Sequence, residues 1–360
     1  LYPLGEFEKM LTYLREAETM ASAISDSRRL GLVSVHTAEY LRQTGRFAEA
    51  RTLAEQALAL SDKLQDMPLR LYASHYLGLA CHGLGDYRRA SEVLRAVVHS
   101  PPAEWRTGAI GGMVMGSWAA FQSISLAWLA RCLAERGEFE EGVDAGRRAV
   151  ALAEELGSPY SLAAAYIGLG YCCLVRGDLD AARPALERAC GVAGEANLTL
   201  LRPQAIRLLG GTSLLAGRTD EGEALVRAAA DDVESGQLLM QQVAVLVLLG
   251  EACLVAGHVD EASTAARRAL TLARERGQRG DEAAALRVLG DIEQAEQHYL
   301  AAIALAAELE MRPLLARTHL GIGRLYLRAG DHARAEDHLV TARRLFTAMD
   351  MPAWLEQAKP

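Results

Sequence analysis

The chain has 360 residues, of which 51% are apolar and 23% are charged, and its formal net charge is -8. This composition is typical of a folded protein and excludes a disordered chain, while the acidic balance argues against a nucleic-acid partner, which would need a basic face. No apolar run in the sequence approaches the ~20 residues needed to cross a bilayer, so we expect a cytoplasmic protein with no membrane partner.

Turns led by glycine recur from the first residues onward, and successive copies such as Gly45 and Gly85 are 40 residues apart. One helical hairpin cannot bury its apolar face alone, so a repeat of this kind predicts hairpins that stack into a solenoid. The copies begin at Gly5, Gly45, Gly85, Gly137, Gly177, Gly217, Gly257 and Gly330.

Within each unit, apolar residues recur at three- and four-residue intervals, which predicts helices throughout. The first helix carries a Leu-Gly pair, as at Leu209-Gly210 and Leu249-Gly250, and the second carries Ala soon after the turn glycine. A glycine inside a helix costs ~1 kcal/mol relative to Ala, so we expect a partner helix to approach closely at each pair. Most of the cysteines follow the same period, which predicts reduced core thiols and no disulfide or zinc framework.

This order of Leu-Gly pair, turn glycine and Ala resembles the tetratricopeptide repeat (TPR), whose standard unit has ~34 residues. The resemblance implies an all-α fold, a TPR-like α-solenoid in which helix-turn-helix repeats with a period of about 40 residues form a right-handed superhelix. We expect residues 1–360 to form one domain of about eight to nine repeats, the first a half-repeat. We also interpret the chain as a fragment of a longer polypeptide.

The first interruption of the period lies between Gly85 and Gly137, which are 52 residues apart. The extra residues fall near 99–117, a stretch that contains Trp105, Met113 and Met115. Gly-rich segments without periodicity are usually flexible loops. The alternative is a partner-binding loop that uses Trp105 and the two methionines as contacts.

The second interruption is a shortened unit near 281–310. Its Leu-Gly pair at Leu289-Gly290 runs almost directly into the second helix, and the usual turn is missing. Either this unit is deformed or residues are absent from it, and we favour the second interpretation.

Several segments extend the resemblance beyond the repeat. They include Gly85-Asp86-Tyr87-Arg88-Arg89-Ala90, Ala127-Trp128-Leu129-Ala130-Arg131-Cys132 and Met349-Asp350-Met351-Pro352-Ala353-Trp354. Together they are similar to the C-terminal repeat region of bacterial signalling proteins that join a class III adenylate/guanylate cyclase domain to an AAA-type ATPase. The resemblance implies that the cyclase and ATPase domains lie upstream, and the chain departs from the pattern near Asp291, where relatives carry a longer stretch.

The sequence offers no constellation for catalysis. A phosphate-binding loop needs Gly-Lys-Ser/Thr, and none of Lys9, Lys63 and Lys359 follows a glycine. His75 and His82 share a helical face, but no third metal ligand is evident. We therefore predict no catalytic residue, no cofactor site and no metal site.

If the chain resembles other tetratricopeptide arrays, its first helices line a concave groove, and positions beside each Leu-Gly pair point into it. The predicted groove residues are Tyr72, His75, His82, Arg131, Tyr171, Gln204, Arg207, Glu251, Arg287, Arg317, Arg324 and Arg328. The distal part is rich in arginine, so we expect it to bind an acidic peptide or carboxylate through bidentate contacts. The alternative is that these arginines pair with neighbouring acids and stay solvated.

The preferred function is a non-catalytic regulatory scaffold, which binds a protein or peptide and passes its occupancy to attached ATPase or cyclase domains. The alternative is the effector-sensing arm of an ATP-dependent bacterial transcription activator.

Overall fold

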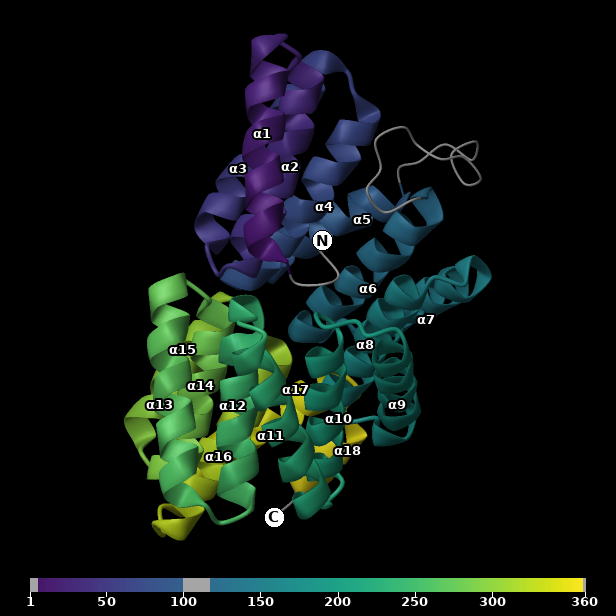
Figure 1. Cartoon of the computed structure of the whole chain (residues 1–360). Helices are drawn as coiled ribbons and strands as arrows, with labels where there is room; N and C mark the ends of the chain where they lie inside the picture. Colours follow the sequence, from purple (N-terminus) through teal and green to yellow (C-terminus); the bar gives the residue numbers. More distant parts are fainter. Residues whose placement is uncertain (1–5, 100–116, 359–360) are drawn as a thin grey trace.

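The computed structural model describes residues 6–99 and 117–358. These residues form eighteen α-helices and contain no strand, which confirms the predicted all-α solenoid (Figure 1). The earlier helices are α1 (Phe7–Ala23), α2 (Ser27–Gln43), α3 (Phe47–Leu64), α4 (Met67–Leu84), α5 (Tyr87–His99), α6 (Trp118–Arg136), α7 (Phe139–Leu156), α8 (Pro159–Arg176) and α9 (Leu179–Glu195). The later helices are α10 (Arg202–Leu215), α11 (Thr219–Ser235), α12 (Leu239–Val255), α13 (Val259–Arg276), α14 (Arg279–Glu293), α15 (Glu296–Glu308), α16 (Arg312–Arg328), α17 (His332–Ala348) and α18 (Pro352–Gln357). Among the described helices, none combines the length and the apolar character that crossing a bilayer requires.

The ends of the helices explain the spacing of the glycines. Gly85 ends α4 with a φ of 84°, and its N–H donates to the carbonyls of Cys81 and His82. A left-handed backbone costs an L residue roughly 1–2 kcal/mol and costs glycine little. At its other end α4 begins after Asp66, whose carboxylate accepts a hydrogen bond from the Leu69 N–H at 2.9 Å. This N-cap satisfies one of the free donors of the first turn.

The Leu-Gly pairs, and Gly168 beside one of them, lie where helices pack closely. A Cβ on Gly168 of α8 would be 2.6 Å from the carbonyl oxygen of Ala127 on α6. A Cβ on Gly170 would be 2.6 Å from Cγ of Leu186 on α9. The packing role expected for these glycines is therefore confirmed, because any side chain there would push a neighbouring helix away.

Later helices of the solenoid contact earlier ones at a constant interval along the chain. Helix α12 contacts α2, α14 contacts α4, and α16 contacts α6. Each of these pairs is ten helices apart, so five hairpins complete one superhelical turn and the following hairpins stack on the first ones. Trp354 of α18 continues the series, since its ring lies against Gly177 at the end of α8.

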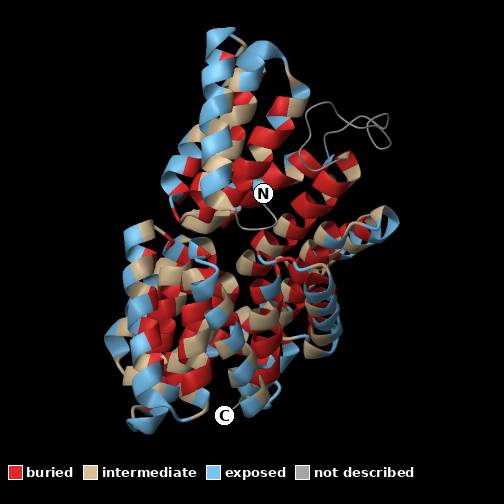
Figure 2. Ribbon diagram, in the orientation of Figure 1, coloured by how far each residue is buried: buried red, intermediate tan, exposed pale blue. Residues whose placement is uncertain are grey.

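The two superhelical turns share a hydrophobic core. One cluster joins Phe139 and Cys172 of the first turn to Phe346, Met349 and Trp354 of the second. Polar contacts lie beside it, because Arg88 and Arg136 both pair with Glu310 and Arg176 pairs with Asp350. Figure 2 shows the same pattern across the molecule, with buried residues on the facing sides of helices and exposed residues outside.

The shortened unit near 281–310 is a hairpin whose helices are short, with 15 and 13 residues, and whose two-residue connection is as long as that between α4 and α5. Gln294 ends α14 with a left-handed φ of 50°, and α15 begins at Glu296. The ring of Tyr299 lies against Gly290, and its hydroxyl donates to Asp291 at 2.6 Å. The expectation that this unit lacks a turn is therefore wrong. The division of 1–360 into a single domain stays a prediction.

The long interval between α5 and α6 falls outside the described residues. The candidate contacts Trp105, Met113 and Met115 lie there, so their proposed role stays a prediction.

Candidate binding cavity

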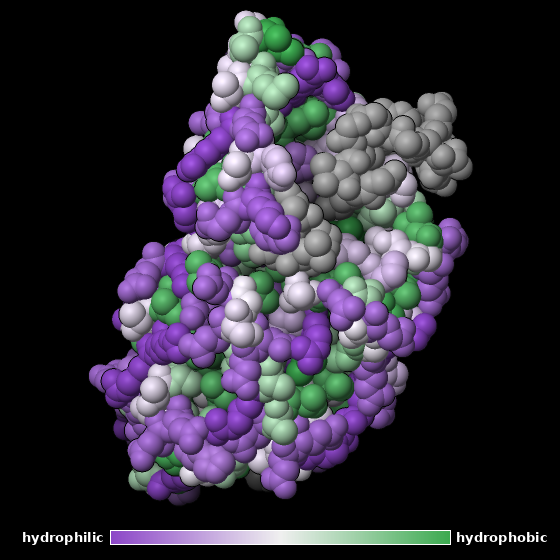
Figure 3. Space-filling model, viewed as in Figure 1, coloured by the Kyte–Doolittle hydropathy of each residue, from purple (hydrophilic) through white to green (hydrophobic). Residues whose placement is uncertain are grey.

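The inner faces of the helices enclose a cavity of about 470 Å³. Every even-numbered helix from α2 to α18 contributes to its lining, so both superhelical turns form its wall. We call this space the central cavity. Its apolar and aromatic lining includes Phe47, Tyr87, Trp128, Leu174, Leu208, Met240, Leu248, Met311 and Trp354. The outer surface is different, because hydrophilic residues cover most of the face shown in Figure 3.

Most of the groove residues predicted from the sequence meet in the central cavity. These are His82, Arg131, Tyr171, Gln204, Arg207, Glu251, Arg287, Arg317 and Arg324. The repeat places them together because each occupies the inner face of a first helix. Their role in binding stays a prediction.

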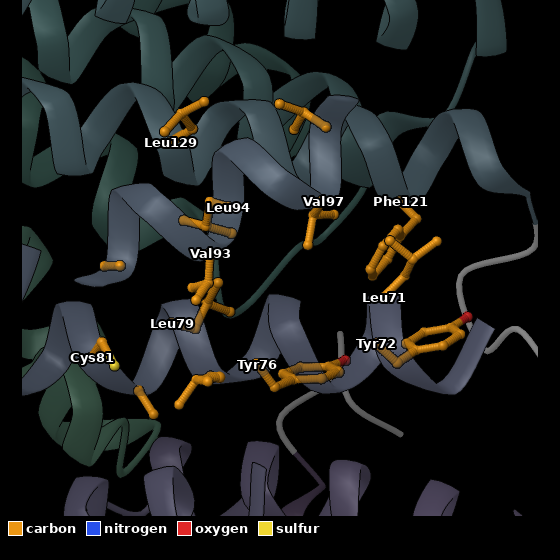
Figure 4. Close-up of a cluster of buried hydrophobic side chains, with 14 of the residues drawn as sticks. Leu71, Tyr72, Tyr76, Leu79, Cys81, Val93, Leu94, Val97, Phe121 and Leu129 are labelled. Carbon is orange, nitrogen blue, oxygen red and sulfur yellow. The ribbon is translucent and has the colours of Figure 1, made fainter. Parts of the chain in front are cut away.

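Tyr72 and His75 do not line the cavity. Figure 4 shows Tyr72 in the cluster between α4, α5 and α6 near Phe121, and the two ring centroids are 4.9 Å apart. His75 is fully buried, with its Nδ1 2.9 Å from Oγ of Ser125. Burial lowers the pKa of His75 to about 3, so the imidazole is neutral. The prediction that Tyr72 and His75 point into the groove is wrong because α2 and α6 pack against α4.

Arg328 also lies outside the cavity lining. It is exposed near the end of α16 and donates a hydrogen bond to the side chain of Gln294. This contact holds it beside the turn that connects α14 and α15.

Two of the distal arginines pair with carboxylates of the protein, and a third donates to a backbone carbonyl. Arg287 pairs with both Glu251 and Asp291, and Nη2 of Arg317 is 3.3 Å from the same Glu251. Arg324 donates to the carbonyl of Gln357 at 3.0 Å. Arg287 and Arg317 thus pair with acids, as the alternative interpretation expected, and binding of an acidic group by the distal groove stays a prediction.

Arg131 and Arg207 differ from Arg287 and Arg317. Within the described residues, neither makes an ion pair with a carboxylate, and Arg207 makes no hydrogen bond. Arg131 donates to Oε1 of Gln204 at 3.0 Å, and its guanidinium lies 4.1 Å from the centroid of the Trp128 ring. Burial lowers the pKa of Arg131 to about 10 and lowers that of Arg207.

Two carboxyl groups in the cavity were missed from the sequence. Glu135 on α6 accepts a hydrogen bond from the hydroxyl of Tyr171, and Asp281 on α14 accepts one from Nε2 of Gln278 at 2.8 Å. Burial raises the pKa of Glu135 to about 7 and that of Asp281 to about 6. Helical spacing could have revealed Glu135, since it lies four residues after Arg131 and shares its face.

The chemistry of the cavity is that of a binding site. Its walls are apolar, with a few polar groups that converge on one space, which is the usual composition of a ligand pocket. In the described part of the chain, no three His, Cys, Asp or Glu side chains gather as metal ligands would. The six cysteines there are free thiols.

Comparison with known families identifies the repeat. A tetratricopeptide-repeat model matches residues 122–194 and 279–348, and two further models of the same repeat match 37–105 and 243–268. The chain therefore contains tetratricopeptide repeats, which confirms the resemblance to that repeat, while the similarity to cyclase-ATPase signalling proteins stays a prediction. No curated protein matches the chain.

Several solved structures share the fold. A Rap protein complexed with Competence and Sporulation Factor gives a TM-score of 0.74 at 12% identity, covering 99% of this chain and 98% of that one. The Rap conjugation gene regulator of plasmid pLS20, in complex with the Phr* peptide, gives 0.61 at 14% identity, with coverage of 97% and 96%. A signal transduction ATPase with a tetratricopeptide repeat sensor from Pyrococcus horikoshii gives 0.50 at 12% identity, with 98% of this chain and 54% of that one covered. Identities this low show likeness of fold alone.

Proposed function

We propose that the chain is a non-catalytic regulatory scaffold that binds a peptide, or an extended segment of a protein, in the central cavity. The observation that carries the proposal is the lining, which comes from every even-numbered helix and from both superhelical turns. A ligand in this space contacts hairpins that are far apart in the sequence. Its binding energy therefore favours the stacked arrangement of the two turns.

The size of the cavity limits the ligand. A volume of about 470 Å³ lies within the ~300–1,000 Å³ typical of small-ligand pockets. It accommodates a few residues of an extended peptide and excludes a folded domain. Two of the structures with the same fold hold a signalling factor or a peptide, which supports this class of ligand.

In the proposed setting, the array works in the cytoplasm and reports its occupancy to ATPase or cyclase domains of the same protein. The resemblance to cyclase-ATPase signalling proteins supports this setting. The likeness of fold to an ATPase with a tetratricopeptide repeat sensor supports it as well.

The alternative function is the effector-sensing arm of an ATP-dependent transcription activator. The enclosed form of the cavity favours it, because a small effector fits the same space. A ligand that binds without any peptide bond would favour this alternative over the first.

The proposal is tested by filling the cavity. Ala244 on α12 lines the cavity, so Ala244→Trp places an indole in the ligand space. The matched control is Ala304→Trp on α15, where the alanine is exposed. A pool of random pentapeptides is passed over the immobilised chain, and retained peptides are identified by mass spectrometry.

We expect the native chain and the Ala304→Trp variant to retain the same peptides, and the Ala244→Trp variant to retain none. A melting temperature close to that of the native chain shows that the Ala244→Trp variant is folded. Equal retention by all three proteins would contradict binding in the central cavity.

A further inference from the structure

We propose that Arg131 and Arg207 form an anion subsite in the central cavity and that this subsite binds a carboxylate of the ligand. This inference rests on the proposed function and names the group that the ligand must carry. The carboxylate comes either from a peptide C-terminus or from an Asp or Glu side chain.

The first argument is the contrast between the arginines that line the cavity. Arg287 and Arg317 both contact Glu251, and Arg287 also contacts Asp291, so carboxylates of the protein already compensate their charges. Within the described chain, Arg131 and Arg207 make no such pair. Both guanidinium groups are half-buried, so the lack of a carboxylate partner is costly, and an anionic ligand would reduce that cost.

The second argument is the way in which Arg131 is held. Its guanidinium lies between the rings of Trp128 and Tyr171, at 4.1 and 5.5 Å from their centroids. Gln204 accepts a hydrogen bond from Nη1, while the Nε–H is buried and has no hydrogen-bond partner among the residues that the structure describes. A guanidinium fixed on aromatic faces loses little entropy when it binds a carboxylate. Arg131 therefore has an oriented plane and an unused donor.

The third argument is the position of Arg207 on α10, where it lies one helical turn from Gln204, the residue that accepts the hydrogen bond of Arg131. An electrostatic interaction with Arg207 makes the positive charge of Arg131 less favourable. Two adjacent guanidinium groups attract an anion more strongly than either one alone. Both line the same cavity, together with Gln204.

The nearby carboxyl groups do not neutralise the positive charge of this subsite. Glu135 and Asp281 interact electrostatically with Arg207, but neither lies within ion-pair distance of Arg131 or Arg207. Burial raises the pKa of both carboxyl groups, so each takes up a proton readily and can then donate a hydrogen bond. An incoming carboxylate raises these pKa values further, and ligand binding is therefore expected to tighten as the pH falls from 8 to 6.

The test starts from one peptide retained by the native chain from the random pentapeptide pool. It is synthesised in three forms: with a free C-terminus, with a C-terminal amide, and with any Asp or Glu replaced by Asn or Gln. Dissociation constants are measured by fluorescence anisotropy for the native chain, Arg131→Gln and Arg207→Gln. The control is Arg183→Gln on α9, where the arginine pairs with Glu187 and Glu221 and does not line the cavity.

We expect one neutralised form to bind the native chain about 10- to 100-fold more weakly, as loss of a charged hydrogen bond implies. The form that weakens identifies the source of the carboxylate. Arg131→Gln and Arg207→Gln should each weaken binding of the charged peptide by a similar factor. The same variants should change the affinity for the neutralised form by no more than about twofold. The control should match the native chain.

The outcomes separate the inference from the proposed function. Equal affinity for all three peptide forms would overturn the carboxylate subsite while leaving peptide binding intact. If the native chain retains Lys- or Arg-rich peptides, and Glu135→Gln and Asp281→Asn weaken the binding of those peptides, the cavity holds a cation subsite and the carboxylate subsite is contradicted. If no peptide is retained by the native chain, both proposals fail. Should a Gln variant not fold, Arg207→Lys keeps the charge but loses bidentate geometry, and unchanged affinity in that variant would also contradict the inference.

Discussion

The indole of Trp354 rests on the backbone of Gly177, with Cδ1 and Nε1 each 2.9 Å from the position that a Cβ on this glycine would occupy. The contact joins α18 to the end of α8, and beside it Arg176 pairs with Asp350. Because Gly177 has no side chain, Trp354 can approach its backbone closely, and this contact helps to join the two superhelical turns.

We predict that Gly177→Ala destabilises the protein more than Gly217→Ala. Both glycines have a positive φ, of 90° and 76°, so alanine meets similar backbone strain of roughly 1–2 kcal/mol at each. Gly177 has Trp354 against it, whereas no described residue lies within 4 Å of a Cβ at Gly217. Thermal unfolding and the radius of gyration by small-angle scattering measure the difference. Equal melting temperatures for the two variants would contradict the closure contact.

We predict that Gly168→Ala lowers the free energy of unfolding by about 1–3 kcal/mol, because its Cβ would lie 2.6 Å from the carbonyl oxygen of Ala127. The matched control is Gly191→Ala, which is also within a helix but has nothing within 4 Å of the added Cβ. The control should be neutral or more stable by about 0.5–1 kcal/mol. Urea denaturation distinguishes the two results.

We predict that the unliganded protein becomes less stable as the pH rises from about 4 to about 7. Burial raises the pKa of Glu135 from 4.5 to about 7 and that of Asp281 from 3.8 to about 6. A carboxyl group with a raised pKa contributes stability below its unfolded pKa and loses it as the pH passes through the folded value. Melting curves at several pH values measure this dependence.

Two variants isolate the carboxyl contribution. Glu135→Gln and Asp281→Asn should each flatten the pH profile within this window, because a neutral amide does not titrate. Glu140→Gln, at an exposed position on α7, is the control and should leave the profile unchanged. A profile that keeps its slope in the double variant would show that other groups cause it.

We predict that Glu251→Gln lowers the free energy of unfolding by about 1–3 kcal/mol, since it removes one carboxylate from Arg287, whose side chain is 9% exposed. Asp291 still pairs with this guanidinium, so the loss is partial. The control is Glu49→Gln, which breaks an ion pair with Arg46 that is more than half exposed on both sides. Exposed pairs contribute about 0–1 kcal/mol, so the control should change little. Chemical denaturation of both variants gives the comparison.

The sequence predicts the local architecture well because its signals are local. The recurrence of Gly45 and Gly85 marks the hairpin turns, and both have the left-handed backbone that favours glycine. The Leu-Gly pairs point to close helix contacts, as Gly168 and Gly170 show. The same periodicity places Arg131 and Arg207 on inner faces, although their pairing state depends on residues from other repeats.

Closure of the superhelix lies beyond this kind of prediction. The contacts of Arg176 with Asp350 and of Gly177 with Trp354 depend on the small rotation between neighbouring hairpins, summed over five of them. No local sequence pattern predicts this summed rotation. For the same reason the compensation of Arg287 by Glu251 and the burial of His75 follow from helices that meet only in three dimensions.

The constant offset between stacked helices constrains how this array can change in length. Removing one hairpin between α6 and α16 would shift α16 by two positions against its earlier partner, so that α16 would face α4 instead of α6 and Glu310 would leave Arg88 and Arg136. Growth or loss of whole units is thus tolerated only outside the stacked region, whereas an extension of a connecting segment, as in the interval between α5 and α6, leaves this register untouched.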